Sequence, residues 1–271
     1  MTRRVRLDAE LVRRHLAKSR DHAASLIDAG RVTVGGQTAG KAATQVLTDA
    51  AIVVRGSDEP VWVSRGAQKL LGALAAFEPL GLDVAGRQCL DAGASTGGFT
   101  EVLLSRNAAV VHAIDVGYGQ LAWSLRSDPR VCIHDRTNIR ELRREDLEGD
   151  VDLIVSDLSF ISLTVVMPAL ARLCSPGGDM VLMIKPQFEV GRGNVGKNGV
   201  VRDTELHAQA IHRVCQAAGT VGWGTRALVA SPLPGPAGNV EYFSWLRADA
   251  PASSLEAAAS VVADGPAGAP S

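Results

Sequence analysis

The chain has 271 residues, enough for one α/β domain of about 200 residues together with a small additional module. Its 46% hydrophobic and 21% charged residues are typical of a soluble globular protein, and its net charge of −1 favours no class of partner. No apolar run reaches the roughly 18 residues of a membrane span, and neither a signal peptide nor a metal-ligand spacing of the four cysteines is present, so we expect a cytoplasmic protein with reduced thiols and no metal.

Positive charge is concentrated at the start of the chain. Residues 1–60 hold 10 Lys and Arg against 7 Asp and Glu, and the first twenty residues hold 7 against 2. Such a basic surface is expected where a module touches phosphates, although a solvated helix face would give the same count. We predict helices at residues 7–17 and 19–29, the second capped by Ser19 and ended by Gly30, and a strand at residues 31–34.

These elements carry the pattern R-L-D-x-x-L, followed by S-R-x-x-A-x-x-L-I-x-x-G-x-V-x-V-x-G. The order resembles the S4 RNA-binding domain over about 55 residues. The resemblance implies a small α+β S4-like domain at residues 1–59, with an RNA-facing surface that includes Arg4, Arg6, Arg20 and Lys41.

Turn-forming and polar residues from Gly56 to Pro60 predict a domain boundary, and residues 60–63 are expected to form a linker. The next segment, 64–77, has the periodicity of an amphipathic helix, with Arg65 and Lys69 outside its apolar stripe. The second domain is expected to span residues 64–247.

Beyond residue 88, strands and helices alternate, which predicts a doubly wound parallel α/β sheet. Only ten residues separate the last two strands, too few for a parallel crossover, so we expect this pair to be antiparallel. A parallel sheet with one antiparallel strand is the Rossmann-like methyltransferase architecture. The Ala-, Pro-, Gly- and Ser-rich residues 248–271 are expected to be a disordered tail. The expected strands are 89–91, 110–115, 131–134, 151–157, 179–185, 225–230 and 241–247, and the expected helices are 99–106, 120–127, 162–174 and 204–217.

A glycine-rich turn follows the first strand, in the run from Cys89 to Thr100. Glycines there let backbone N–H groups approach a ligand at a helix N-terminus. The loop lacks the Lys-Ser/Thr of a phosphate loop, and Ser95 replaces the second glycine of the dinucleotide pattern, so a ligand without a pyrophosphate fits better. We predict S-adenosylmethionine, with a plain βα turn as the alternative. The expected cofactor contacts in this run are Asp91, Gly93, Ala94, Ser95, Thr96, Gly97, Gly98 and Phe99.

Further cofactor contacts are expected where later strands end, because ligands of such sheets bind beyond the carboxyl ends of the strands. Asp115 ends the second strand, where an acidic side chain bonds ribose hydroxyls, although a turn aspartate would stand there equally well. Asn138 follows the third strand at a position suited to adenine, and Asp157 ends the fourth.

Lys185 directly follows the apolar segment 180–184, so it emerges at the edge of the cleft. A surface lysine that caps the strand is the alternative. If partial burial and a neighbouring lysine loosen its proton, Lys185 can act as a general base. Strand direction gathers Asp157, Lys185 and Glu241 around this cleft, and Lys69 can join them from its helix.

The motifs W-V-S-R-G-A-Q-K-L, L-D-A-G-A-S-T-G-G-F-T, S-D-L-S-F-I-S-L, I-K-P-Q-F-E and N-V-E-Y-F together resemble the TlyA-type, haemolysin-A-like ribosomal RNA 2′-O-methyltransferases. These enzymes join an S4 domain to an FtsJ-like methyltransferase domain. The resemblance implies a catalytic tetrad of Lys69, Asp157, Lys185 and Glu241, with S-adenosylmethionine as cofactor. It implies methylation of cytidine 2′-hydroxyls in 16S and 23S ribosomal RNA within ribosomal subunits, and no obligate protein partner is evident.

The glycine-rich segment 187–202 is expected to be a mobile loop over the RNA strand, with an ordinary flexible loop as the alternative. RNA contacts are expected from Arg192 and Lys197 in this loop and from Arg65. Three other functions compete with methyl transfer. A membrane-active haemolysin is disfavoured because the sequence has no membrane-spanning segment. A non-catalytic RNA-binding assembly factor is disfavoured because it would not require the complete tetrad. An S4-linked pseudouridine synthase would leave the glycine loop and Lys185 unexplained.

Overall fold

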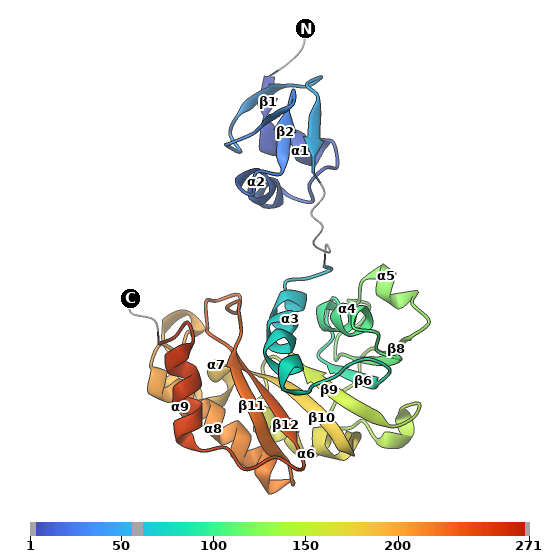
Figure 1. Cartoon of the computed structure of the whole chain (residues 1–271), viewed down its shortest axis with the longest axis vertical. Helices are drawn as coiled ribbons and strands as arrows, with labels where there is room; N and C mark the ends of the chain where they lie inside the picture. The colour runs from blue at the N-terminus through green and yellow to red at the C-terminus, as the bar shows by residue number, and fades with distance from the viewer. Residues whose placement is uncertain (1–3, 56–61, 269–271) are drawn as a thin grey trace. The chain divides into compact units, whose positions relative to one another are not determined.

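The computed structural model describes residues 4–55 and 62–268, and the chain divides into two compact units between Val61 and Trp62 (Figure 1). Within the second unit, the side chains of Arg192 and Lys197 are not among the described ones. Most of the predicted boundary and linker, residues 56–61, also lies outside the described residues.

The N-terminal unit packs two helices against two small antiparallel sheets. Helix α1 (Leu7–Arg13) ends before the predicted residue 17, because His15 takes a left-handed φ of 59° that an α-helix cannot contain. Helix α2 (Arg20–Asp28) begins as predicted, since the Ser19 hydroxyl accepts a hydrogen bond from the His22 N–H at 3.1 Å. The strands are β1 (Arg4–Arg6), β2 (Val32–Val34), β3 (Gln37–Thr38), β4 (Gln45–Leu47) and β5 (Ile52–Val54), paired in the orders β1-β4 and β3-β2-β5.

The second unit is built on a seven-stranded sheet of β6 (Gln88–Ala92), β7 (Val110–Ile114), β8 (Val131–His134), β9 (Val151–Ser156), β10 (Cys174–Ile184), β11 (Gly224–Ala230) and β12 (Tyr242–Arg247). Their order across the sheet is β11-β12-β10-β9-β6-β7-β8. The strands from β6 to β10 are mutually parallel, whereas β12 is antiparallel to both β10 and β11. The predicted parallel sheet with one reversed strand is therefore confirmed.

Both faces of this sheet are buried. Along β9, Leu153 and Val155 enter one hydrophobic cluster and Ile154 enters the other, as alternate residues of a strand must. The first cluster also takes side chains from α3 (Gly66–Phe77), α4 (Gly98–Ser105) and α5 (Trp123–Arg126). The second takes them from α6 (Leu163–Leu173), α8 (Thr204–Thr220) and α9 (Leu255–Asp264).

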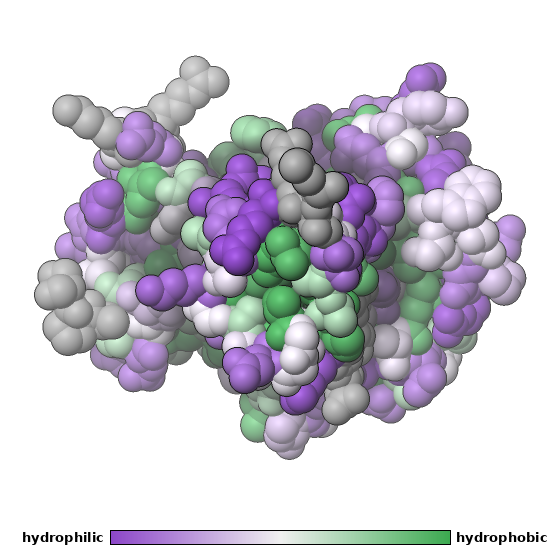
Figure 2. Space-filling model, turned by 90° about the horizontal axis from the view of Figure 1, so that it is seen from above, coloured by the Kyte–Doolittle hydropathy of each residue, from purple (hydrophilic) through white to green (hydrophobic). Residues whose placement is uncertain are grey.

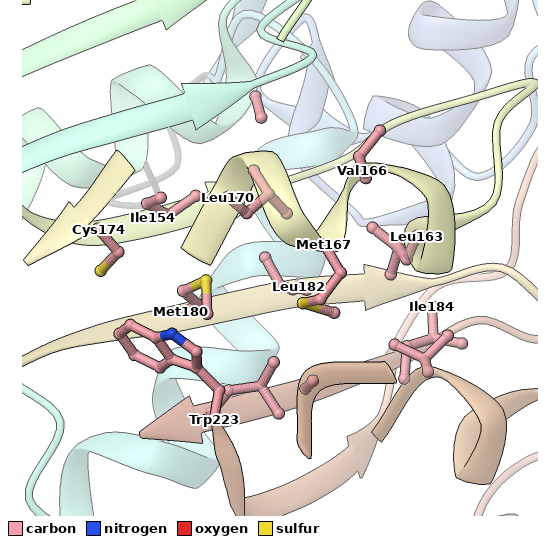
Figure 3. Close-up of a cluster of buried hydrophobic side chains, with 14 of the residues drawn as sticks. Ile154, Leu163, Val166, Met167, Leu170, Cys174, Met180, Leu182, Ile184 and Trp223 are labelled. Carbon is pink, nitrogen blue, oxygen red and sulfur yellow. The ribbon is translucent and has the colours of Figure 1, made fainter. Parts of the chain in front are cut away.

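Figure 3 shows part of the cluster under α6. Leu163, Met167 and Leu170 of this helix face Leu182 and Ile184 of β10, and all of them are at most 2% exposed. This packing fixes α6 against the middle of the sheet, and with it the segment that leads from β9 into α6.

The structure corrects two predictions, one about the C-terminal tail and one about the boundary between a helix and the strand after it. Residues 255–264 of the predicted disordered tail form α9, which Ser254 caps and which buries Ala258 and Val262 in the core. Strand β10 begins at Cys174, where a helix end was predicted, and pairs irregularly with β9 up to Asp179. A short helix, α7 (Pro186–Glu189), follows β10 directly.

Within the described residues, no helix is both long enough and apolar enough to cross a membrane. Hydrophilic residues are spread over the face that Figure 2 shows, with smaller hydrophobic areas between them. All four cysteines are free thiols, as their spacing predicted.

Candidate active site

Polar side chains meet at the carboxyl edge of the parallel strands. Asp157 follows β9 and Lys185 follows β10, its parallel neighbour. Because β12 runs in the opposite direction, its first residue pairs with the last residue of β10, Tyr242 with Ile184. Glu241 and Lys185 are therefore adjacent at this edge, as strand direction predicted.

Two lysine–carboxylate pairs form there. Lys69 Nζ lies 2.5 Å from Glu241 Oε2, and Lys185 Nζ lies 2.5 Å from Asp157 Oδ1. The side chains of both lysines are only 9% exposed. Removing ion pairs from water costs free energy that their attraction rarely offsets in full, so such pairs are poor evidence of a stabilising role.

A loop that closes over Glu241 keeps one of these pairs from solvent. The backbone passes so close at Gly235 that a Cβ there would lie 2.6 Å from Glu241 Oε1. The neighbouring Pro234 and Pro236 line the same cavity as Lys69. Glu241 is consequently 1% exposed and held against a single cation, Lys69, among the described side chains.

A cavity of about 240 Å³ brings Lys69 and Asp157 together with the glycine loop. Of the predicted loop residues, Gly93, Ala94, Ser95, Thr96, Gly98 and Phe99 line this cavity, as does the predicted RNA contact Arg65. Gly97 and Asp91 do not line it.

Two glycines of the loop are required by packing against other parts of the protein. At Gly93, whose φ is 89°, a Cβ would lie 2.9 Å from the carbonyl oxygen of Asp157. At Gly97, whose φ is 99°, a Cβ would collide with Leu125 and Leu121 of the apolar core. Gly97, a predicted cofactor contact, is therefore required by core packing and lines neither this cavity nor the one described next.

A second cavity, of about 450 Å³, shares Gly93, Ser95 and Asp157 with the first and continues past Asp115 and Asn138. Asp115 accepts hydrogen bonds from the Ser95 N–H at 2.8 Å and the Gly117 N–H at 2.7 Å, so it also holds the loop in place. The volume and the polar edge of this second cavity suit a nucleoside.

Asp91 is fully buried beneath α4, outside both cavities. Its carboxylate accepts a hydrogen bond from the Thr100 hydroxyl at 2.7 Å. Burial raises the pKa of Asp91 to about 7, although the hydrogen bond from Thr100 opposes this shift. The structure therefore separates Asp91 from the other predicted cofactor residues and ties it to the first turn of α4.

Ser159 was not among the predicted residues, although it accepts a hydrogen bond from Lys185 Nζ at 2.8 Å. Gln120, which lines the second cavity, was not among them either. A signal for Ser159 was present, because a hydroxyl two residues beyond Asp157 stands at the end of the strand next to the one that carries Lys185.

In the N-terminal unit, the predicted RNA contacts Arg4, Arg6, Arg20 and Lys41 are all exposed. Arg6 and Arg20 both donate to Asp8 Oδ2, at 2.8 and 3.0 Å. The Arg6 guanidinium beside it holds the pKa of Asp8 well below its usual range. Two exposed guanidinium groups are thus held side by side by one buried carboxylate.

Comparison with known proteins agrees with these features. Residues 62–248 match the family model of the FtsJ-like methyltransferases, and residues 5–52 match that of the S4 domain. The 16S/23S rRNA (cytidine-2′-O)-methyltransferase TlyA of Mycobacterium tuberculosis is 59% identical over 247 residues, which cover 91% of this chain and 91% of that protein. The putative rRNA methyltransferase YqxC of Bacillus subtilis is 40% identical over 91% of this chain and 86% of that protein. A solved structure of a putative hemolysin from Streptococcus thermophilus is 35% identical, with a TM-score of 0.72 over 97% of this chain and 96% of that chain.

Proposed function

The chain belongs to the TlyA-type members of the FtsJ-like methyltransferase family, which carry an S4 domain, and from this premise we propose that it methylates cytidine 2′-hydroxyls of 16S and 23S ribosomal RNA with S-adenosylmethionine. The observation that carries the proposal is the pair of buried lysine–carboxylate contacts, Lys69 with Glu241 and Lys185 with Asp157, beside the glycine-loop cavities. A ribosomal RNA substrate would be met in the cytoplasm.

The two connected cavities fit S-adenosylmethionine. Gly93 lines both cavities, and Asp115 with Asn138 offers acceptors and donors for a nucleoside. The main chain of Ala94 and Ser95 and the side chain of Asp157 would hold the remainder. When bound, S-adenosylmethionine supplies a methyl group activated by the positive charge of its sulfonium.

The chain's own residues then have to hold the ribose and remove a proton. A ribose 2′-hydroxyl is a poor nucleophile at neutral pH, so a base that accepts its proton speeds the attack. Lys185 Nζ is the proposed acceptor, with Asp157 holding it at the cavity edge. Lys69, kept in place by Glu241, can donate to a ribose oxygen. Positioning by these groups supplies much of the rate.

The N-terminal unit is proposed to supply affinity for ribosomal RNA. Arg6 and Arg20 are exposed and share Asp8, an arrangement that suits two phosphates of one backbone. Arg4 and Lys41 extend the basic surface, and Arg65 is proposed to meet the RNA at the entrance of the first cavity. Arg192 and Lys197 stay predicted contacts in the loop between α7 and α8.

The deciding experiment compares ribosomal RNA nucleosides by mass spectrometry in cells with and without this protein. Loss of 2′-O-methylcytidine, restored by the wild-type chain but not by Lys185→Ala, is the expected result. Purified protein should then methylate isolated 30S and 50S subunits from the deleted cells. Unchanged 2′-O-methylcytidine in the deleted cells would exclude the proposed substrate.

A further inference from the structure

Lys185 Nζ contacts two oxygen atoms that come from one loop, a carboxylate oxygen of Asp157 and the hydroxyl oxygen of Ser159. This nitrogen lies 2.5 Å from Asp157 Oδ1 and donates a hydrogen bond to Ser159 Oγ at 2.8 Å. Ser159 is exposed, whereas Lys185 is 8% exposed. Ser159 also lines the second cavity, where the cofactor is proposed to bind.

The chemistry of an amine gives this arrangement a consequence. A neutral lysine has two N–H bonds and one lone pair, arranged tetrahedrally around Nζ. Ser159 Oγ takes one N–H bond and the Asp157 carboxylate lies against the same nitrogen as an ion-pair partner, so these two oxygens occupy two sides of Nζ and the lone pair is left for the remaining direction. We infer that Ser159 is a positioning residue that aims the lone pair of Lys185 at the ribose 2′-hydroxyl, an inference that rests on the proposed function.

In the step itself, the 2′-O–H bond breaks and its proton forms a third N–H bond on Lys185. The electron pair left on the oxygen would form the new O–CH₃ bond while the S–CH₃ bond of the sulfonium breaks, and the electrons of that bond would stay on the sulfur as a neutral thioether. A second carboxylate in place of Ser159 would bind the ammonium form more tightly and oppose proton uptake from the hydroxyl. A neutral hydroxyl fixes the direction of the amine without adding a second negative charge.

The Ser159 hydroxyl is fixed although it is exposed, because its loop is anchored at both ends. The Asp157 N–H donates to the carbonyl of Ala92 at 3.1 Å. At the other end, Glu189 accepts hydrogen bonds from the Leu163 N–H and from the Ser162 hydroxyl. Between them Phe160 takes a left-handed φ of 65°, a strained conformation that the anchors maintain.

The test measures single-turnover methylation of unmethylated 50S subunits by Ser159→Ala and Ser159→Thr, with radioactive S-adenosylmethionine. Ser127→Ala is the matched control, since Ser127 is also exposed and donates only to helix carbonyls. Ser159→Ala should lower the rate about ten- to a hundredfold, with unchanged S-adenosylmethionine affinity by calorimetry. Ser159→Thr keeps the hydroxyl and should recover most of the rate.

The pH dependence separates positioning from a structural role. Removing an acceptor that stabilises the ammonium should move the midpoint of the rise in rate to lower pH in Ser159→Ala, and not in Ser127→Ala. A rate for Ser159→Ala within about twofold of wild type, or a loss with an unmoved midpoint, would overturn the inference. The proposed function fails separately, if the wild type transfers no methyl group or if Lys185→Ala remains active.

Discussion

The carboxylate of Glu189 lies 2.5 Å from the hydroxyl of Ser162, and this contact joins the segment after β10 to the segment after β9. Glu189 also accepts from the Leu163 N–H at 2.7 Å, at the N-terminus of α6, where a negative charge is favoured. The same two segments are joined a second time by Lys185 and Asp157. The two segments are thus joined near the ends of their strands, by Lys185 and Asp157, and again farther along, by Glu189 and Ser162.

Replacing Glu189 by glutamine should therefore slow methyl transfer without weakening cofactor binding. The amide keeps only one acceptor for two donors, so the loop that carries Asp157 and Ser159 loses one anchor. We expect a single-turnover rate roughly tenfold lower and a free energy of unfolding lower by about 1 kcal/mol. Asp203→Asn, which alters the N-cap of α8, is the control. Equal rates for the two variants would contradict the anchoring role.

Asp91 should make the stability of the chain depend on pH. Burial raises the pKa of Asp91 to about 7, above the value near 3.8 of the unfolded chain. The stabilisation of the folded state by protonated Asp91 is therefore complete below pH 3.8 and is lost as the pH rises through about 7. Asp91→Asn removes this dependence and keeps an acceptor for Thr100. The free energy of unfolding is measured with urea at pH 5 and at pH 8. Between these pH values it should fall by on the order of 2 kcal/mol more in the wild type than in Asp91→Asn. A constant difference would show that Asp91 does not titrate in this range.

The edge of the sheet that carries the proposed catalytic residues could be predicted from sequence because strand direction alone determines it. Apolar runs that end in Asp157 and Lys185, and a last strand too close to its predecessor to be parallel, bring these residues and Glu241 to one edge. The approach of Lys69 to Glu241 joins residues 172 positions apart and depends on tertiary packing. The periodicity of its helix showed only that Lys69 lies outside the apolar stripe.

Other features depend on packing that no local pattern encodes. A strand end does not reveal whether a carboxylate faces a ligand or a helix, and Asp91 turned out to lie under α4. Helix α9 was missed because residues 248–271 as a whole are rich in Ala, Pro, Gly and Ser, a composition typical of disordered segments. Its two buried residues, Ala258 and Val262, are small and only four positions apart, so the apolar signal is weak until α8 and β11 cover them.

Asp8→Asn should weaken binding to ribosomal subunits even though it removes a negative charge. Asp8 holds Arg6 and Arg20, whose side chains are 45% and 59% exposed, in one orientation. Without the carboxylate both guanidinium groups regain rotational freedom, and we expect a roughly three- to tenfold loss of affinity. The matched control is Glu10→Gln, which makes the same charge change in α1 but faces Arg13 and Arg14. Filter binding that shows tighter association of Asp8→Asn would mean that net charge alone governs this surface.

Lys185→Arg tests whether Lys185 is a base or only a positive charge. Guanidinium stays protonated and cannot accept the proton of a 2′-hydroxyl, so Lys185→Arg should be as inactive as Lys185→Ala. Neither change should prevent folding, because the Asp157 side chain is 23% exposed and water can replace its partner. Lys69→Arg preserves the charge that faces Glu241 and should retain a measurable part of the rate.

The pH dependence gives an independent check on Lys185. If it takes the proton, the single-turnover rate of the wild type should rise with pH to a plateau, and the midpoint should report ionisation in the complex. Both Lys185 variants should lack this rise while binding S-adenosylmethionine with nearly wild-type affinity by calorimetry. Substantial methylation by Lys185→Arg with saturating subunits would reject the base and leave Lys185 an electrostatic role, since a fixed positive charge could then replace the amine.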